Sequence, residues 1–351
     1  MVRRRQTLAG TLLLLCALLL SAACSKPSNG RERGAETETP FTRRDGLYDA
    51  ARPTDKVIVT VGKFGRVFRS ENNGQTWVHV DAGRTRDLYS VAFSDDTTGV
   101  IVGSGGTYLR TADQGRTWQP QASLGTGELF KVVFGAQGHG FVVGAFGAVW
   151  RSDSAGKLWR RVKVSWETII PEIWDAAGPV EPHLYDVVLR GNTVWIVGEY
   201  GLALRSDDGG ATWARLHGGA LEDSHLFAVA FMDAGRLVAA GQAGTVLYTD
   251  DDGAHWSEAS LTEQDLYDVI FLHKAGTAVV TGDLGTTFFS PAGGRPGSWR
   301  VLQAKRDGPG AASPPLWLAK VLPRNNRQVL AFGASGIAPL PVPQGNGRGA
   351  D

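Results

Sequence analysis

The 351-residue sequence has only two cysteines, Cys16 and Cys24, and both lie near its N-terminus. The rest of the chain therefore has no disulfide and no thiol chemistry. The formal net charge at pH 7 is +1, so no field over the whole chain favours nucleic acid. The sequence also lacks a His/Cys cluster, a nucleophile elbow and a phosphate-binding loop. We expect no metal, no cofactor and no nucleic-acid partner.

The N-terminal segment predicts export. Three arginines, at positions 3–5, precede an apolar run from Leu8 to Leu20. This run of about 13 residues is too short to favour a membrane-spanning helix. Small residues then lead to Cys24, which resembles a bacterial lipobox, although Ser21 stands where leucine is commoner. We expect residues 1–23 to be a lipoprotein signal peptide, with an ordinary signal peptide as the alternative.

Lipidation of Cys24 would make it the mature N-terminus. The next residue is Ser25 and not an aspartate, which favours the outer over the inner membrane, on the periplasmic side. Residues 24–44 are polar and contain prolines and glycines, which is typical of a flexible tether.

What the sequence has in abundance is glycine, 46 residues, and tryptophan, 11 residues, as in a turn-rich all-β protein. One turn motif, best seen at 205–213, recurs along the chain. Asp208 can accept hydrogen bonds from its own turn, Gly209 and Gly210 allow positive φ, and Trp213 can be buried against a neighbouring unit. The copies are 69–77, 110–118, 151–159, 205–213, 248–256 and a degraded one at 289–299.

The tryptophans of these copies are about 41 to 54 residues apart, which is the spacing of a propeller or solenoid repeat. The pattern S-x-D-x-G-x-T-W is the Asp-box, or BNR repeat. We expect its residues to be structural: Ser70, Asn72, Trp77, Asp113, Trp118, Ser206, Asp208, Trp213, Asp251 and Trp256. A calcium site at 250–252 lacks a full ligand set.

A second motif precedes each turn: Leu-aromatic-x-apolar, followed by a strand that ends in G-x-x-G. Its seven copies begin at Leu47, Leu88, Leu129, Leu184, Leu226, Leu266 and Leu316. Four short antiparallel strands in each of seven units predict an all-β, seven-bladed β-propeller over residues 45–343, followed by a disordered tail at 344–351. Residues around 37–42 are expected to supply the outer strand that the seventh unit lacks, which would close the ring.

The strand order places the Asp-boxes on one face and the G-x-x-G turns with the inter-blade connections on the other. The connection from Arg161 to His183 is the longest, and long loops on a rigid scaffold often carry function. A lid that packs its tryptophans on the propeller is the structural alternative. The predicted binding residues are Phe64, Trp166, Trp174, Tyr200, Lys63 and Glu199. A further polar set, Asp49, Lys131, Asp186 and Asp268, is expected to line a solvated channel.

Some Asp-box proteins are sialidases or endoglucanases, which need a pair of opposed carboxylates. The sequence offers Glu167, Asp175, Glu199 and Asp283 for such a pair, but nothing singles one out. The arginine motif expected of a sialidase is missing. Arginines that repeat with the scaffold are expected to interlock the blades or lie at the surface: Arg69, Arg110, Arg151 and Arg205.

The repeated combination of L-[YF]-x-V, V-V-G-x-x-G and D-G-G-x-T-W behind a lipoprotein signal resembles the Ycf48/HCF136 family. The segments 103–118 and 198–213 match well, whereas the sixth and seventh units are worn. That resemblance implies a photosystem II assembly factor with an arginine-bearing patch for a membrane-protein intermediate. Relatives in bacteria without photosynthesis have other partners. We expect a monomeric, lipid-anchored, non-catalytic scaffold for a membrane protein complex. An extracellular Asp-box glycoside hydrolase is the alternative.

Overall fold

The computed structural model describes residues 41–42, 45–171, 178, 180–216, 224–233, 235–302, 317–325, 328–334 and 336–343. All of them belong to one compact unit, Thr39–Asp351. The predicted signal peptide, Cys24, Trp174, Asp175 and the C-terminal tail lie outside the described residues, and only part of the predicted tether is described.

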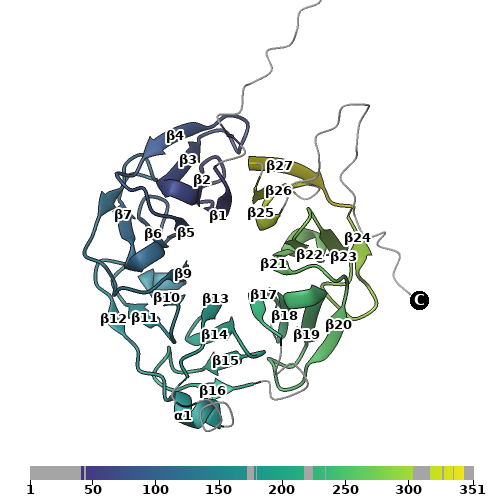
Figure 1. Cartoon of the computed structure of the whole chain (residues 1–351). Helices are drawn as coiled ribbons and strands as arrows, with labels where there is room; N and C mark the ends of the chain where they lie inside the picture. Colours follow the sequence, from purple (N-terminus) through teal and green to yellow (C-terminus); the bar gives the residue numbers. More distant parts are fainter. Residues whose placement is uncertain are drawn as a thin grey trace, which may run out of the picture. The chain divides into compact units, whose positions relative to one another are not determined.

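Seven antiparallel sheets stand around a central axis, and their first strands line the centre (Figure 1). In each sheet the strands follow one another in sequence order from the centre outwards. Blade 1 has β1 (Leu47–Ala51), β2 (Ile58–Gly62), β3 (Arg66–Ser70) and β4 (Val78–Asp81). Blade 2 has β5 (Leu88–Phe93), β6 (Gly99–Gly103), β7 (Tyr108–Thr111) and β8 (Gln119–Pro120). Blade 3 has β9 (Leu129–Phe134), β10 (Gly140–Gly144), β11 (Val149–Ser152) and β12 (Arg160–Arg161).

The remaining blades repeat this plan. Blade 4 has β13 (Leu184–Arg190), β14 (Thr193–Gly198), β15 (Ala203–Ser206) and β16 (Ala214–Arg215). Blade 5 has β17 (Leu226–Asp233), β18 (Arg236–Gly241), β19 (Thr245–Thr249) and β20 (Ser257–Ser260). Blade 6 has β21 (Leu266–Leu272), β22 (Thr277–Gly282), β23 (Thr287–Ser290) and β24 (Arg300–Val301). Blade 7 has β25 (Leu318–Asn325), β26 (Gln328–Gly333) and β27 (Gly336–Pro341). The predicted seven-bladed propeller is therefore confirmed.

Helical segments are few and short. Five single 3-10 turns occur at η1 (Lys63–Gly65), η2 (Ser104–Gly106), η3 (Ala136–Gly138), η4 (Gln242–Gly244) and η5 (His273–Ala275). The one α-helix of the described ranges, α1 (Trp166–Ile169), lies in the connection between blades 3 and 4. Within those ranges no helix has the length and apolar character needed to cross a bilayer.

The Asp-boxes form the turns that the sequence predicts. In blade 4 the carboxylate of Asp208 accepts hydrogen bonds from the backbone N–H groups of Ala211 and Thr212, both at 2.9 Å, and from the Ser206 hydroxyl at 2.8 Å. The Thr212 hydroxyl, which donates to Asp208 at 2.6 Å, and these donors hold the pKa of Asp208 well below its ordinary value. Asn72, Asp113 and Asp251 make the same contacts in their own turns. Their side chains are thus occupied in shaping hairpins.

The tryptophan after each Asp-box packs against the preceding blade. Trp118 joins the cluster of Val59 and Val61, and Trp213 meets Phe141 edge to face with ring centroids 6.4 Å apart. The repeated arginines interlock the blades, as predicted, but each reaches the following blade. The Arg69 guanidinium donates to the Gln114 carbonyl at 2.9 Å, and equivalent bonds run from Arg151 to Gly209 and from Arg205 to Asp252.

The first and last blades share one apolar cluster, in which Leu47 and Trp77 contact Leu330 and Phe332. This contact closes the ring. The described part of blade 7 has three strands only. Of the segment expected to add a fourth strand, residues 37–40 lie outside the description, and residues 41–42 form no strand. Phe41 instead packs on Phe68, with ring centroids 4.7 Å apart.

The predicted alignment of the seventh repeat was wrong by two residues. In blade 1, Leu47 pairs with Gly62 at the end of β2, and the other blades keep this pairing. In blade 7 the residue that pairs with Gly333 is Leu318, not Leu316. Lys320 therefore occupies the position of Asp49 in blade 1.

Candidate functional site

In blades 1–6, the G-x-x-G turn between the second and third strands lies on the same face as the inter-blade connections, as predicted. The backbone shows this directly, because a Cβ added to Gly65 would meet the carbonyl of Arg84, and one added to Gly244 would meet that of Thr262. The opposite face carries the Asp-boxes, where Asn73 donates its N–H to Lys56 at the turn between β1 and β2. We call the first of these surfaces the G-x-x-G face.

The centre of this face is ringed by aromatic side chains, here called the aromatic collar. Each stands directly after the leucine that begins an inner strand, and all are half-buried. Its members are Tyr48, Tyr89, Phe130, Tyr185, Phe227 and Tyr267, completed by Trp317. Neighbouring rings touch, with centroids 5.3 to 5.9 Å apart from Trp317 round to Tyr267. Blade 7 has Ala319 in the collar position, which leaves a gap between Tyr267 and Trp317.

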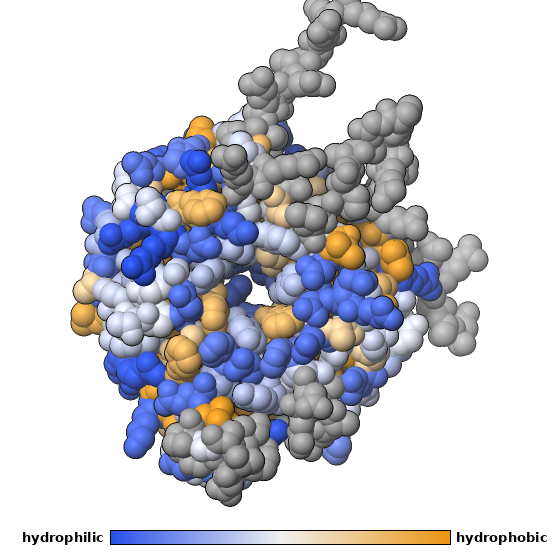
Figure 2. Space-filling view, viewed as in Figure 1, coloured by the Kyte–Doolittle hydropathy of each residue, from blue (hydrophilic) through white to orange (hydrophobic). Residues whose placement is uncertain are grey.

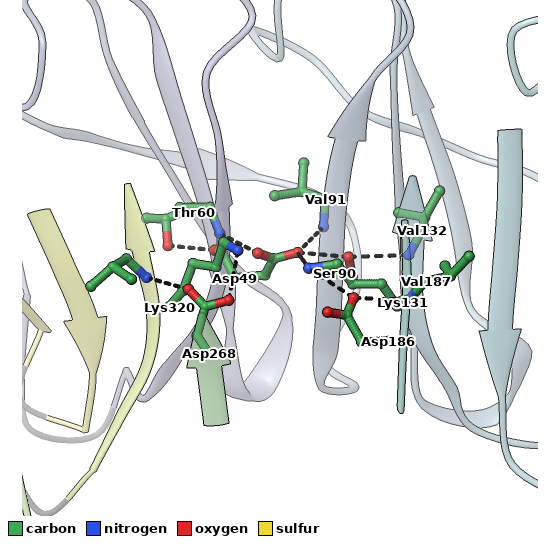
Figure 3. A network of polar contacts seen from close by, with 12 residues as sticks. Asp49, Thr60, Ser90, Val91, Lys131, Val132, Asp186, Val187, Asp268 and Lys320 are labelled. Carbon is green, nitrogen blue, oxygen red and sulfur yellow. Dashed lines mark hydrogen bonds and ion pairs between the residues drawn. The ribbon is translucent and has the colours of Figure 1, made fainter. Parts of the chain in front are cut away.

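One residue further along the inner strands lies a second ring, here called the charged layer (Figure 3). It consists of Asp49, Lys131, Asp186, Asp268 and Lys320. The Lys131 ammonium is 3.4 Å from Asp49 and 3.9 Å from Asp186, and Lys320 is 2.9 Å from Asp268. The layer therefore contains three carboxylates and two ammonium groups.

The expectation of a solvated lining was wrong for the carboxylates of this layer. Asp49, Asp186 and Asp268 are 3%, 7% and 5% exposed. Each also reaches into the next blade: Asp49 accepts from the Ser90 hydroxyl at 2.6 Å, and Asp186 from the Val229 N–H at 2.9 Å. Buried carboxylates are tolerated where such donors and counter-charges surround them.

The three carboxylates differ in proton affinity. For Asp49, burial opposes ionisation, but Lys131 and Lys320 outweigh it and hold the pKa below its ordinary value. For Asp186 and Asp268, burial prevails over the lysines and raises the pKa. The neighbouring carboxylate of Asp268 raises the pKa of Asp186 further. Negative charge is thus compensated at Asp49 and incompletely compensated at Asp186 and Asp268.

The collar and the charged layer enclose a cavity of about 100 Å³, here called the central socket. Figure 2 shows an opening at the centre of the ring. This volume is several times what one water molecule needs. A small polar headgroup that entered between the aromatic rings would meet the charged layer.

Around the collar, the third residue of the G-x-x-G turn has a positive φ in each of blades 1–6. Phe64, Phe146 and Leu284 adopt this left-handed conformation with φ of 55°, 53° and 52°, although their side chains are bulky. They are also 63%, 62% and 63% exposed. Glycine or asparagine would adopt this backbone with less strain. Folding alone therefore does not account for three large apolar side chains at these positions.

Acidic residues near these turns link adjacent blades. The N–H of Phe64 donates to Asp87 at 2.9 Å, and the N–H of Ala243 donates to Asp265 at the same distance. At the junctions between blades 3 and 4 and between blades 4 and 5, histidine replaces the acid: Phe146 meets His183 edge to face at 5.1 Å, and Tyr200 lies 6.3 Å from His225. Tyr200 is therefore half-buried against a histidine.

The predicted binding residues do not share one environment. Trp166 is 4% exposed and packs against Gly147 in the core of blades 3 and 4, so its indole offers no surface for docking; for this tryptophan the structural alternative, a packed lid, is what the structure shows. Trp174 lies outside the described residues. Lys63 places its ammonium over Trp317, 5.8 Å from the ring centroid. Phe64 remains exposed on the G-x-x-G face.

The carboxylates considered for catalysis are not brought together as a free pair. Glu199 accepts the backbone N–H of His183 at 2.8 Å and the Tyr185 hydroxyl at 3.4 Å. Burial, followed by the charge of Glu199, raises the pKa of Tyr185 to about 12. Asp283 is bonded to Tyr267, whose pKa burial also raises. Glu167 lies exposed on α1, and Asp175 is outside the described residues.

Two further features of this region escaped the sequence analysis. Lys320 was missed because of the misaligned seventh repeat. Arg84 and Arg86, both exposed, line a pocket of about 320 Å³ between the first inter-blade connection and the turn at Gly105. A larger groove of about 560 Å³ runs along β4, but its charged walls are paired with each other through Glu71, Arg69 and Arg116. We therefore regard the G-x-x-G face as the candidate site.

Comparison with known proteins follows the repeats. A family model described as photosynthesis system II assembly factor YCF48 matches residues 69–172 and 128–221. No curated protein matches the sequence. A solved structure of YCF48 bound to a D1 peptide superposes with a TM-score of 0.65 at 19% identity, covering 87% of this chain and 95% of that one.

Two other solved structures show how widely this fold is shared. YCF48 from Cyanidioschyzon merolae superposes with a TM-score of 0.65 at 18% identity, covering 87% of this chain and 98% of its own. A GH74 xyloglucanase from Xanthomonas campestris reaches 0.64 at 15% identity, with 84% and 51% covered. At these identities the likeness shows the fold alone. Together with the family model, which matches within residues 69–221, it confirms the resemblance that the repeats predict: the chain is a seven-bladed Asp-box β-propeller that is similar to the Ycf48 family.

Proposed function

We propose that this propeller is a non-catalytic assembly scaffold that binds a segment of a membrane protein on its G-x-x-G face. The observation that carries the proposal is the set of Phe64, Phe146 and Leu284. Exposed apolar side chains on a strained backbone point to a function other than folding. They stand at the turns of blades 1, 3 and 6 and share their face with a basic pocket at Arg84 and Arg86.

A partner of this kind also suits the relatives. The structure of YCF48 with a D1 peptide is that of a propeller with a polypeptide ligand. A photosystem II subunit is the partner that this resemblance implies. Arginine and aromatic side chains are the residue types enriched at interface hot spots. Of the carboxylates considered for catalysis that the structure describes, Glu199 and Asp283 are occupied in hydrogen bonds to tyrosines or backbone, which argues against their use as a free glycosidase pair.

Membrane attachment completes the proposal. We infer that Cys24 is acylated and that the following residues tether the propeller on the periplasmic side, at the outer membrane in preference to the inner. A flexible chain of about 20 residues has a root-mean-square span of roughly 25 Å. The scaffold would then search the space directly above the bilayer, where the exposed loops of membrane proteins lie.

The test is capture of partners from detergent-solubilised membranes. The triple variant Phe64→Ser, Phe146→Ser and Leu284→Ser removes the exposed apolar set without touching the propeller core. Leu158→Ser is the matched control, because Leu158 is 77% exposed in the Asp-box of blade 3, on the opposite face. We expect the triple variant to lose the partners that the wild type and the control recover. Equal recovery by all three proteins would exclude this face.

A further inference from the structure

The charged layer has an uneven distribution of charge around the axis. The seven equivalent positions, in blade order, are Asp49, Ser90, Lys131, Asp186, Ala228, Asp268 and Lys320. A lysine stands between Asp49 and Asp186, and another between Asp268 and Asp49. Only Ala228 stands between Asp186 and Asp268. Two of the three intervals between the aspartates thus contain a lysine, and the third interval, at blade 5, contains none.

The two existing lysines show what a cation does in this ring. Lys131 lies between the carboxylates of two other blades, at 3.4 Å from Asp49 and 3.9 Å from Asp186. Lys320 pairs with Asp268 at 2.9 Å. Asp186 has no closer ion pair than the one at 3.9 Å, and its pKa is raised by burial and by Asp268. The negative charge that the layer leaves uncompensated therefore lies on the blade 5 side.

The aromatic collar independently points to the same class of ligand. Half-buried aromatic rings line the central socket together with the charged layer. Ring faces attract ammonium and guanidinium groups, and they do so more strongly where water is displaced. Lys63 over Trp317 already shows one such contact at the rim. At Ala319 the lining of the socket has a methyl group where the other blades have a ring.

We propose that the central socket binds one organic monocation, an ammonium or guanidinium group, between Asp186 and Asp268 beneath the aromatic collar. The headgroup would complete the ring of alternating charges, and its alkyl chain would lie between the rings. A free amine and the side chain of a lysine or arginine on a partner present the same chemistry. The inference does not require the proposed partner, because a small cation can be tested alone.

Ala228→Lys places the missing cation on the protein itself. A lysine at this register can reach both neighbouring carboxylates, as Lys131 does from blade 3. We expect this variant to melt at a higher temperature than the wild type and to lose binding of added cations. Asp186→Asn keeps the shape of the site and removes its charge, and we expect it to weaken cation binding by roughly tenfold or more. Asp207→Asn is the matched control, because Asp207 lies in an Asp-box and its side chain is 63% exposed.

The assay is calorimetric titration of the purified full chain with n-propylguanidinium or n-propylammonium chloride, against sodium chloride at equal ionic strength. Saturable binding by the wild type and by Asp207→Asn, but not by Ala228→Lys, supports the proposal. Should Ala228→Lys fail to fold, Asp186→Asn decides the question. Binding that Asp186→Asn leaves unchanged, or an equal response to sodium, overturns the proposal.

A second arm assigns the source of the cation. If n-propylguanidinium displaces captured membrane proteins from the immobilised wild type, the cation is a partner's side chain. If capture persists while the small cation still binds, the ligand is a free amine. If the wild type captures no membrane protein but still binds the small cation, the proposed partner is refuted and the proposed cation site is retained.

Discussion

Asp49→Asn tests whether the charged layer holds the blades together. The Asp49 carboxylate is 3% exposed, accepts hydrogen bonds from the Ser90 hydroxyl at 2.6 Å and the Val91 N–H at 3.2 Å, and lies 3.4 Å from the Lys131 ammonium. Asparagine keeps the size and one acceptor oxygen but removes the charge. Every contact to blade 2 and blade 3 is weakened at once.

The expected loss can be set between two limits. Removing one partner of a fully buried ion pair costs roughly 3–5 kcal/mol. Lys131 keeps Asp186 as a second partner and is 21% exposed, which moves the expected value to the lower end, about 3 kcal/mol. With an unfolding entropy of about 2.1 cal/mol/K per residue, a propeller of about 300 residues has roughly 0.6 kcal/mol/K, so the Tm falls by about 5 °C.

The assay is thermal unfolding of the purified protein followed by circular dichroism and calorimetry. Asp207→Asn serves as control, because Asp207 also pairs with an arginine, Arg205 at 2.9 Å, but its side chain is 63% exposed. Exposed pairs contribute about 0–1 kcal/mol, so this control should melt within about 2 °C of the wild type. If Asp49→Asn melts as the control does, the layer does not bind the blades together and the reasoning fails.

Three further predictions follow from the same structure. Because the folded-state pKa of Asp186 is raised, its ionised form costs stability at neutral pH, and this cost disappears as the pH falls through that pKa. Asp186→Asn should therefore lower the stability less than Asp49→Asn does at neutral pH. As the pH is lowered toward about 4, the Tm of the wild type should rise relative to that of Asp186→Asn. Phe64→Asn relieves a left-handed backbone and should raise stability by up to about 1 kcal/mol while reducing partner capture; a fall in both would indicate a folding role. Cys24→Ala should move the protein from the membrane to the soluble fraction and abolish labelling with an alkyne fatty acid, and persistent labelling would contradict lipidation.

The scaffold was predictable because its signals are local and repeated. An Asp-box contains its own donors and acceptors within nine residues, so the sequence at 205–213 specifies the turn that Asp208 forms. The apolar run before each G-x-x-G becomes a second strand buried on both sides, as β2 and β6 are. The repetition of these two signals along the chain fixes the strand order and therefore the two faces.

In the seventh blade, local sequence patterns were not sufficient to predict the strand register. Its Asp-box is absent, and Leu316 with Trp317 matches the leucine-aromatic pattern, whereas Leu318, the leucine in register, is followed by Ala319. Only pairing with Gly333 across the sheet distinguishes them, and strand register is set by the partner strand and the buried face. Burial of Trp166 was equally hidden, because it depends on the glycine at position 147, which leaves room for the indole.

Four residues of the charged layer could be identified from the sequence, but their ion pairs could not be predicted, because these depend on the order of the blades around the ring. Asp49 and Lys131 are 82 residues apart and come from blades 1 and 3, yet their side chains meet. Spacing along the chain gives each residue a position in its own blade, whereas compensation of charge depends on which blades stand next to one another and on how deeply the ring buries them. Once Lys320 is placed in register, the ring has a lysine in every interval between its aspartates but one. That interval, at Ala228, is the reason to look for a cation there.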